Sequence, residues 1–190
     1  PVSVVGRAGV DELAAQTALL MNGRPASKAR LFGKQTAFNV LPESGGGFDG
    51  GAHEKTVVEQ VRRLLGLPGL PIGISVVTVP VFFGCSIAVQ VELARELDAD
   101  AARALFARAA GVRVVDQAKV RYPTAAVEAV ESGDVLVGRI RTDSSRERGI
   151  ALWVVADNVR TLAANLLASA TQILVKGSQV RYSSKEIMDL

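Results

Sequence analysis

The stretch Ile72-Gly-Ile-Ser-Val-Val-Thr-Val-Pro-Val-Phe-Phe83 is almost continuously apolar and rich in β-branched residues, and Cys85-Ser-Ile-Ala-Val-Gln-Val-Glu-Leu93 follows it closely. The first run is typical of a strand that is buried on both faces. In the second run, residues 86–93 alternate between apolar and polar side chains, which predicts a half-buried strand. Two neighbouring strands of this kind predict that a β-sheet forms the centre of the fold.

The segments around these strands add helices and further strands. Apolar spacing predicts helices at residues 10–22, 54–65, 98–110 and 157–176, and strands at residues 36–41, 112–115, 135–141 and 150–155. Asp98 is a good N-cap and Gly111 a good stop for the third helix. We expect one α+β domain over residues 1–190, with residues 177–190 as a C-terminal tail. In this domain the three later helices, which are amphipathic, cover one face of a mixed β-sheet. The other face is too apolar to meet water, so we expect it to pair two chains into a homodimer.

Composition excludes several classes of protein. The chain has 190 residues, of which 48% are hydrophobic and 22% charged, with a formal net charge of +3; these values exclude disordered and collagen-like chains. No apolar run reaches the roughly 18 residues that span a membrane, and no signal peptide is visible. Basic residues occur in short pairs among acidic ones, and aromatic residues make up only 5%, which argues against a nucleic-acid partner.

The rare residues bear on compartment and on metal binding. One cysteine and one histidine exclude an internal disulfide and the usual metal sites, and they favour a cytoplasmic protein. The chain begins with proline and not methionine. We therefore interpret it as a piece of something longer.

Two motifs have a functional and a plainer interpretation. The loop Gly45-Gly-Gly-Phe-Asp-Gly50 matches the G-x-G-x-x-G pattern of dinucleotide sites. However, the next helix begins only near His53, and residues 67–91 contain no acidic residue to hold a ribose, so a flexible loop without a phosphate is favoured. Asp157 and Asn158 begin the predicted last helix and are either simple caps or a place where an anionic group or a carboxamide docks.

The two reactive side-chain types are also weighed against a structural role. His53 precedes a helix without an evident Asp or Ser partner, so a polar residue at a helix start is favoured over a catalytic base. Cys85 lies between two apolar runs, and the cations nearest to it within residues 56–94 are Arg62 and Arg63. A small buried side chain is therefore favoured over a nucleophilic thiolate.

Several segments recur in an order and at a spacing that match one known family. They are Ala37-Phe-Asn-Val-Leu-Pro42, the helix around residues 59–66, Val79-Pro-Val-Phe-Phe-Gly84, Tyr122-Pro-Thr124, Val137-Gly-Arg-Ile-Arg141 and Trp153-Val-Val-Ala-Asp-Asn-Val-Arg160. Together they resemble the C-terminal domain of the aspartate-semialdehyde dehydrogenase family, from about residue 3 to about residue 175. The resemblance implies a domain that dimerises through its sheet and supplies substrate-binding groups, next to an upstream cofactor-binding domain of the same protein. The whole enzyme, it implies, reduces an acyl phosphate with NADPH through a cysteine thioester; we expect this chain alone to bind no cofactor.

The resemblance also implies that the catalytic positions of the family are changed. The substrate-binding glutamate aligns with His53 and the phosphate-binding lysine with Thr56, with a one-residue slip in that loop left open. The arginine that grips the substrate carboxylate aligns with Thr78, and the histidine acid/base with Cys85. Threonine cannot pair bidentately with a carboxylate, and a thiol with a pKa of about 8.5 is a poor substitute for imidazole at pH 7. This pattern fits Usg-like paralogues, which keep the fold and lose catalytic residues.

The cofactor-binding positions implied for this chain are Asp157 and Asn158. Three functions stay open. The first is a dimerisation and scaffold domain of a catalytically degenerate paralogue. The second is part of an active NADP-dependent aldehyde or acyl-phosphate oxidoreductase whose nucleophile and cofactor domain lie upstream. The third is a small-molecule-binding module that retains a pocket without chemistry. An Asn-Cys-Thr nucleophile in an upstream segment would favour the second.

Overall fold

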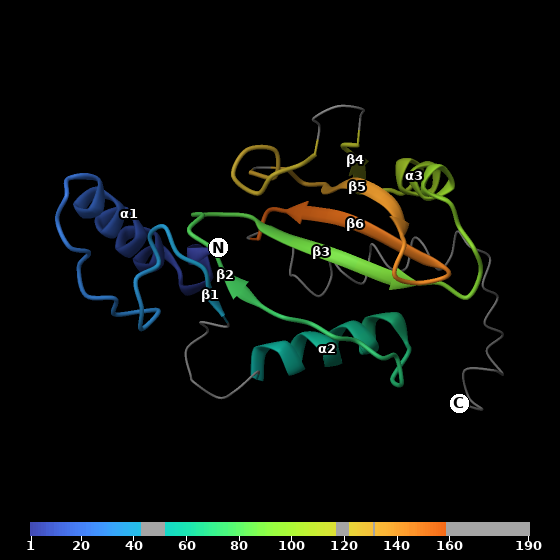
Figure 1. The fold of residues 1–190 in the computed structure, drawn as a ribbon, viewed down its shortest axis with the longest axis horizontal. Coiled ribbons are helices and arrows are strands. Elements are labelled where there is room, and N and C mark those ends of the chain that lie inside the picture. Colours follow the sequence, from blue (N-terminus) through green and yellow to red (C-terminus); the bar gives the residue numbers. More distant parts are fainter. Residues whose placement is uncertain (43–51, 117–121, 131, 159–190) are drawn as a thin grey trace. The chain divides into compact units, whose positions relative to one another are not determined.

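A computed structural model describes residues 1–42, 52–116, 122–130 and 132–158 (Figure 1). The glycine-rich loop at 45–50, the tail at 177–190 and the predicted last helix beyond its first two residues lie outside this part of the chain. The chain folds into two compact units. Unit 1 consists of Pro1–Glu59 with Pro71–Phe83, and unit 2 consists of Gln60–Leu70 with Gly84–Leu190.

Unit 1 is built on one helix and a two-stranded sheet. Its elements are the 3₁₀ helix η1 (Val2–Val5), α1 (Arg7–Met21), and the antiparallel strands β1 (Leu41–Pro42) and β2 (Val77–Thr78). The core consists of Val2, Leu13, Phe32, Ala37 and Leu41. Two polar side chains of α1 hold the following loop: Glu12 Oε2 accepts the Arg30 N–H at 2.8 Å, and Gln16 Oε1 accepts the Thr36 N–H at 2.9 Å. The loop is therefore fixed by its backbone amides, which explains how a segment with few apolar residues is ordered.

Two predicted strands are wrong in extent. Of residues 36–41 only Leu41 is paired, and of residues 72–83 only Val77 and Thr78 are paired. The second segment is also not buried on both faces, because Val77 is 50% exposed and Phe82 is 44% exposed. β-Branched composition favours an extended backbone but does not supply a partner strand. The described partner residues are Leu41 and Pro42, and Pro42 has no N–H to donate to the ladder.

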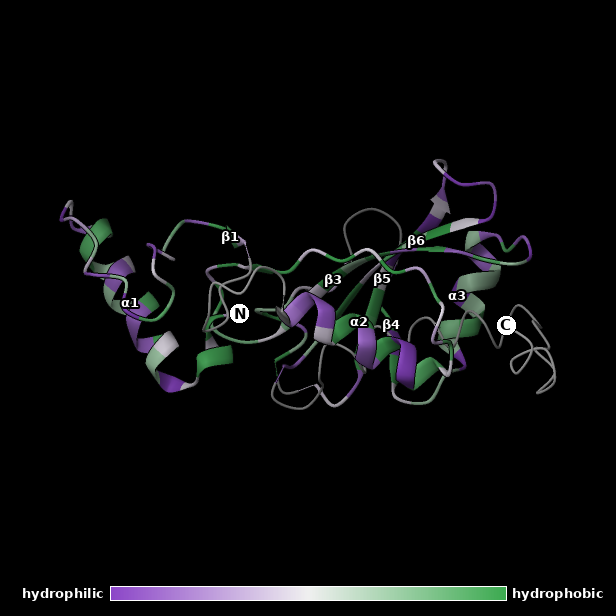
Figure 2. Ribbon diagram, turned by 90° about the horizontal axis from the view of Figure 1, so that it is seen from below, coloured by the Kyte–Doolittle hydropathy of each residue, from purple (hydrophilic) through white to green (hydrophobic). Residues whose placement is uncertain are grey.

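The predicted second helix is present as α2 (Ala52–Leu65) and contributes residues to both units. Val57 and Val61, one turn apart, are 5% and 1% exposed, while polar residues occupy the opposite side, as the alternating purple and green bands of Figure 2 show. The helix stops at Gly66, whose φ of 70° is left-handed. Arg62 Nε donates to the Leu70 carbonyl at 2.8 Å and secures the connection that follows.

Unit 2 contains the predicted mixed sheet. Its strands are β3 (Cys85–Glu92), β4 (Val112–Val114), β5 (Val135–Asp143) and β6 (Gly149–Ala156), in the spatial order β3-β6-β5-β4 (Figure 1). Only β4 and β5 are parallel. The alternation predicted for residues 86–93 is confirmed, since Val89 is buried while Ser86 and Gln90 are exposed.

One face of this sheet carries the main core. Its buried residues are Val89, Leu93, Val135, Val137, Ile140, Ile150, Leu152, Val154 and Ala156, and Ala102 and Phe106 of α3 (Ala99–Ala107) pack with them. Asp98 caps α3 as predicted, because its side chain accepts the Ala101 N–H at 2.7 Å. The helix ends at Ala107, three residues before the predicted end, and a turn leads to Gly111, whose φ is 71°. The described residues thus place α3 over this face, as expected.

The other face of the sheet is partly covered by residues 122–130, named here the 122–130 segment. Ala125 and Ala129 of this segment pack on Leu136 and Val155. The Trp153 indole Nε1 donates to the Pro123 carbonyl at 2.9 Å and fastens the segment to β6. In the part of the chain that the structure describes, none of the helices has the length and apolar character needed to cross a membrane.

Candidate functional site

Cys85, which the family resemblance aligns with an acid/base histidine, begins β3 and pairs with Ala156 at the end of β6. Asn158, two residues beyond β6, accepts the Gly84 N–H through Oδ1 at 2.7 Å. Gly84 has a φ of 81°, and a Cβ added to it would lie 2.6 Å from the Ala125 carbonyl oxygen. Only glycine fits there. The turn before Cys85 is therefore held on one side by Asn158 and on another by Ala125.

The environment of Cys85 keeps its thiol protonated. Burial raises the pKa of the Cys85 thiol above its ordinary value, and the negative charge of Asp157 acts in the same direction. At pH 7 the group is therefore a neutral thiol and neither a thiolate nucleophile nor a proton acceptor. The structure brings together three residues selected from the sequence, Cys85, Asp157 and Asn158.

The other selected residues lie in unit 1. Thr78 is 7% exposed and stands opposite Leu41 in the two-stranded sheet. His53 and Thr56 are exposed in the first turns of α2. Between them, Glu54 Oε1 accepts the Val76 N–H at 2.7 Å, so the carboxylate of α2 fixes the backbone two residues before Thr78.

Glu54 was not singled out from the sequence, although the alignment slip in its loop is a signal for it. With a shift of one residue, the family's substrate-binding glutamate falls on Glu54 and not on His53. In this structure one oxygen of that carboxylate bonds a backbone amide. Its observed task is therefore to hold the chain between α2 and β2.

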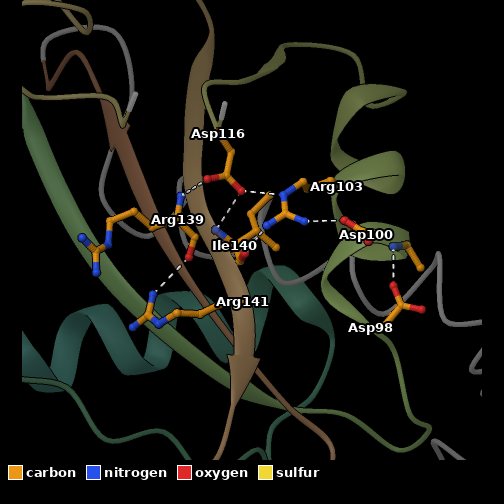
Figure 3. Close-up of polar contacts among 8 residues, drawn as sticks. Asp98, Asp100, Arg103, Asp116, Arg139, Ile140 and Arg141 are labelled. Atoms are coloured by element: carbon orange, nitrogen blue, oxygen red, sulfur yellow. Dashed lines mark hydrogen bonds and ion pairs between the residues drawn. The ribbon is translucent and has the colours of Figure 1, made fainter. Parts of the chain in front are cut away.

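A second polar cluster, around Asp116, was also missed (Figure 3). The carboxylate accepts the Arg139 N–H at 2.9 Å, the Ile140 N–H at 3.1 Å and Arg103 Nε at 2.7 Å. Arg103 in turn donates to the Ile140 carbonyl at 2.7 Å and to Asp100 at 2.6 Å. The hydrogen bond from Arg103 to Asp116 raises the pKa of the guanidinium, so Arg103 stays positively charged at any ordinary pH.

This cluster stabilises an irregularity in β5. The pairing of β5 with β6 shifts between Gly138 and Arg141, and Arg139 has a φ of 53°. A non-glycine residue in this conformation is strained, and the two amides bound by Asp116 are those that the bulge removes from the ladder. The glycine within Val137-Gly-Arg-Ile-Arg141 is the sequence signal for such a bulge, but its partner lies 23 positions away. Among the described residues, no group of three or more His, Cys, Asp or Glu side chains is arranged to hold a metal ion.

Solved structures define the class of this fold. The chain is similar to aspartate semialdehyde dehydrogenase II from Vibrio cholerae, solved in complex with ASA, with a TM-score of 0.79 and 38% identity, covering 96% of this chain and 53% of the other. A probable aspartate-semialdehyde dehydrogenase from Pseudomonas aeruginosa gives a TM-score of 0.76 at 36% identity, over 91% and 52% of the two chains. The fold is thus that of one half of a semialdehyde dehydrogenase.

Sequence comparison identifies the family. The model of the family described as semialdehyde dehydrogenase, dimerisation domain, matches residues 1–161, and the chain belongs to this family. Aspartate-semialdehyde dehydrogenase from Legionella pneumophila is 43% identical over 176 residues, which are 91% of this chain and 50% of the relative. The USG-1 protein homolog from Azotobacter vinelandii is 38% identical over 179 residues, 93% of this chain and 52% of the relative. The chain therefore spans about half the length of the relatives it matches, and the resemblance drawn from the sequence is confirmed.

Proposed function

We propose that this chain is the dimerisation half of a two-domain protein and that its own catalytic positions no longer support the chemistry of the family. The observation that carries the proposal is that Cys85, which aligns with the family's acid/base histidine, is a partly buried thiol at the start of β3. General acid–base catalysis contributes about 10²- to 10⁴-fold when the group titrates near the working pH. A thiol with a raised pKa is far from that condition.

Thr78 supports the same proposal. The family's arginine at this position would bind a substrate carboxylate through two parallel hydrogen bonds. Thr78 is neutral, and its side chain is 7% exposed in a strand that pairs with Leu41. A hydroxyl offers one donor and no charge, so the binding of a carboxylate substrate at this position would be weak.

The positions proposed for the cofactor fit only part of NADP. Asn158 carries a carboxamide of the kind that hydrogen-bonds a nicotinamide, but its Oδ1 accepts the Gly84 N–H. Asp157 adds a negative charge beside it, which disfavours the phosphates of the cofactor. These two residues do not fit a phosphate site. We therefore expect the cofactor to be bound by the domain that this chain does not contain.

A homodimer is the second part of the proposal. The family is described as a dimerisation domain, and closed two-fold pairing is the commonest way in which such domains associate. A stable interface of this type buries on the order of 2,000 Å² or more. Because the chain has a mass of 20.0 kDa, sedimentation at low micromolar concentration should report about twice that mass. A cytoplasmic location, expected from the unpaired cysteine, is part of the same proposal.

The catalytic part is tested in the longer protein that contains this chain. Phosphate-dependent oxidation of aspartate semialdehyde by NADP is measured for the unaltered protein and for Cys85→Ala. We expect little or no turnover, and the same value for the two proteins. Turnover that falls by about 10²-fold or more in Cys85→Ala would refute the proposal.

An active oxidoreductase is the second candidate function. The observation in its favour is that the 43% identity to an aspartate-semialdehyde dehydrogenase exceeds the 38% identity to a USG-1 protein homolog. An active protein would need another group to perform the proton transfer. Turnover in the unaltered protein that survives in Cys85→Ala would select this candidate.

A further inference from the structure

The 122–130 segment has apolar side chains on two sides. Ala125 and Ala129 face the sheet and are 9% and 0% exposed. Tyr122, Val127 and Val130 are 45%, 71% and 40% exposed. Three large apolar side chains within nine residues are thus open to water, and apolar side chains that gather on a surface are typical of contact sites.

The inner side of the same segment lies against the Cys85 site. A Cβ added to Gly84 would come within 2.6 Å of the Ala125 carbonyl oxygen, and a Cβ on Gly138 would come within 2.7 Å of Pro123 Cδ. Both glycines therefore mark places where the 122–130 segment approaches a strand or turn with no space left. Any outward movement of the segment removes the support that Ala125 gives to the turn before Cys85.

A second copy of this chain is the occupant that best fits the exposed side. The family is described as a dimerisation domain, and a two-fold axis brings the same side chains of two copies together, so an uncharged apolar surface is complementary to itself. The one charged residue of the segment, Glu128, is held within its own chain by Thr124, which donates its hydroxyl at 2.6 Å and its backbone N–H at 2.8 Å. The exposed apolar side chains are thus available for a contact without an unpaired charge.

We propose that Tyr122, Val127 and Val130 contact a second copy, and that this contact presses Ala125 against Gly84 and so fixes the turn that carries Cys85. The inference rests on the proposed homodimer and adds a location and a consequence to it. Dimerisation then determines how firmly the turn before Cys85 is held. The 122–130 segment transmits the effect, because its exposed side contacts the second copy and its inner side contacts the turn. Linked equilibria of this kind change affinity or reactivity by about 5- to 150-fold.

The test compares two exposed valines in the 190-residue chain. Val127→Asp places a charge in the proposed contact, and Val4→Asp places the same charge on η1, where Val4 is 61% exposed. Sedimentation measures the mass, and the rate of reaction with a thiol reagent measures the access to Cys85, which is the single cysteine of the chain. We expect Val127→Asp to be a monomer of 20.0 kDa with labelling at least about fivefold faster, and Val4→Asp to match the unaltered chain in both measurements.

Each other outcome has a distinct meaning. An unaltered chain that is monomeric at all concentrations refutes the homodimer and with it this inference. A dimeric Val127→Asp refutes only the location of the contact, and a monomeric Val127→Asp with unchanged labelling refutes the link to Cys85. If Val127→Asp fails to fold, as judged by circular dichroism, dilution of the unaltered chain through its dissociation range replaces it. Labelling that does not accelerate on dilution then overturns the link.

Discussion

Replacing Asp116 with alanine should destabilise unit 2 by about 2–4 kcal/mol. The carboxylate accepts two backbone N–H groups and one guanidinium, and its side chain is only 15% exposed. Hydrogen bonds to a buried charged group contribute about 1.5–3 kcal/mol each. Arg139 is exposed, so water can partly replace the hydrogen bond from its N–H. The Arg103 side chain is 35% exposed, so the ion pair with Asp116 adds no more than about 1 kcal/mol.

A matched control is provided by the second carboxylate on the same arginine. Asp100 contacts Arg103 at 2.6 Å, a distance like the 2.7 Å of Asp116, but its side chain is 95% exposed. Asp100→Ala should therefore cost less than about 0.5 kcal/mol. The two variants remove the same type of ion pair and differ in burial and in the bound backbone amides.

Urea unfolding followed by the fluorescence of Trp153 is the appropriate assay. Trp153 is the one tryptophan of the chain, and it lies in β6, within the same unit as Asp116. In an Arg103→Met background, Asp116→Ala should still lower the free energy of unfolding by more than about 1.5 kcal/mol. The hydrogen bonds from the Arg139 and Ile140 amides to Asp116 do not need the arginine. A thermal midpoint lower by about 5–15 °C should accompany the loss. If Asp116→Ala lowers the free energy of unfolding no more than Asp100→Ala does, the Asp116 carboxylate does not stabilise the bulge in β5.

Three further variants or measurements test the surroundings of the site. Gly84→Ala should cost about 2–4 kcal/mol in the same assay, because alanine is strained at a φ of 81° and its Cβ would meet the Ala125 backbone oxygen; a cost below about 0.5 kcal/mol would contradict the close approach. Cys85 should react slowly with a thiol reagent in native protein and quickly in urea, since burial raises its pKa; rapid native labelling with a thiolate pKa well below 8 would instead indicate a reactive site. The Ser145 N–H and hydroxyl lower the pKa of Asp143, so its folded-state pKa lies below the unfolded value of about 3.9. The stabilisation is therefore complete above that unfolded value and is lost as the pH falls through the folded pKa. Asp143→Asn should make the decline of the urea midpoint below about pH 4 shallower, and an unchanged slope would exclude this role.

The elements that the sequence predicted well are those in which burial of one side produces a periodic pattern of apolar residues. β3 alternates because one of its faces meets the core, and α2 repeats valine at one-turn spacing because one of its sides is buried. The segment at residues 72–83 has no such period. It is apolar throughout, and that composition is equally compatible with a long strand and with the two-residue strand Val77–Thr78 that forms. Its pairing depends on a remote partner, Leu41–Pro42, of which no local pattern around residue 77 gives a sign.

The polar contacts of the two clusters were harder to predict for a related reason. Asp116 binds amides 23 and 24 positions away, and Asn158 binds an amide 74 positions away. These large sequence separations arise from the sheet. Its strand pairing brings the remote segments next to each other, and a prediction of the contacts therefore needs the register of the strands. Asp157 and Asn158 were selected as the start of the predicted last helix, the rest of which lies outside the described residues, and their nearness to Cys85 follows from the pairing of Cys85 with Ala156.

That pairing is also one of the contacts that position Cys85. The position of Cys85 is fixed by the backbone: by the ladder to Ala156, by the Gly84 N–H on Asn158 and by the contact of Gly84 with Ala125. None of these contacts involves the thiol. The register of β3 therefore does not depend on which side chain stands at residue 85, because a slip of one residue would move every core residue of β3 to the wrong face. Gly84 and Asn158 therefore stabilise this turn through the backbone, and under our proposal a change of the side chain at residue 85 affects catalysis alone.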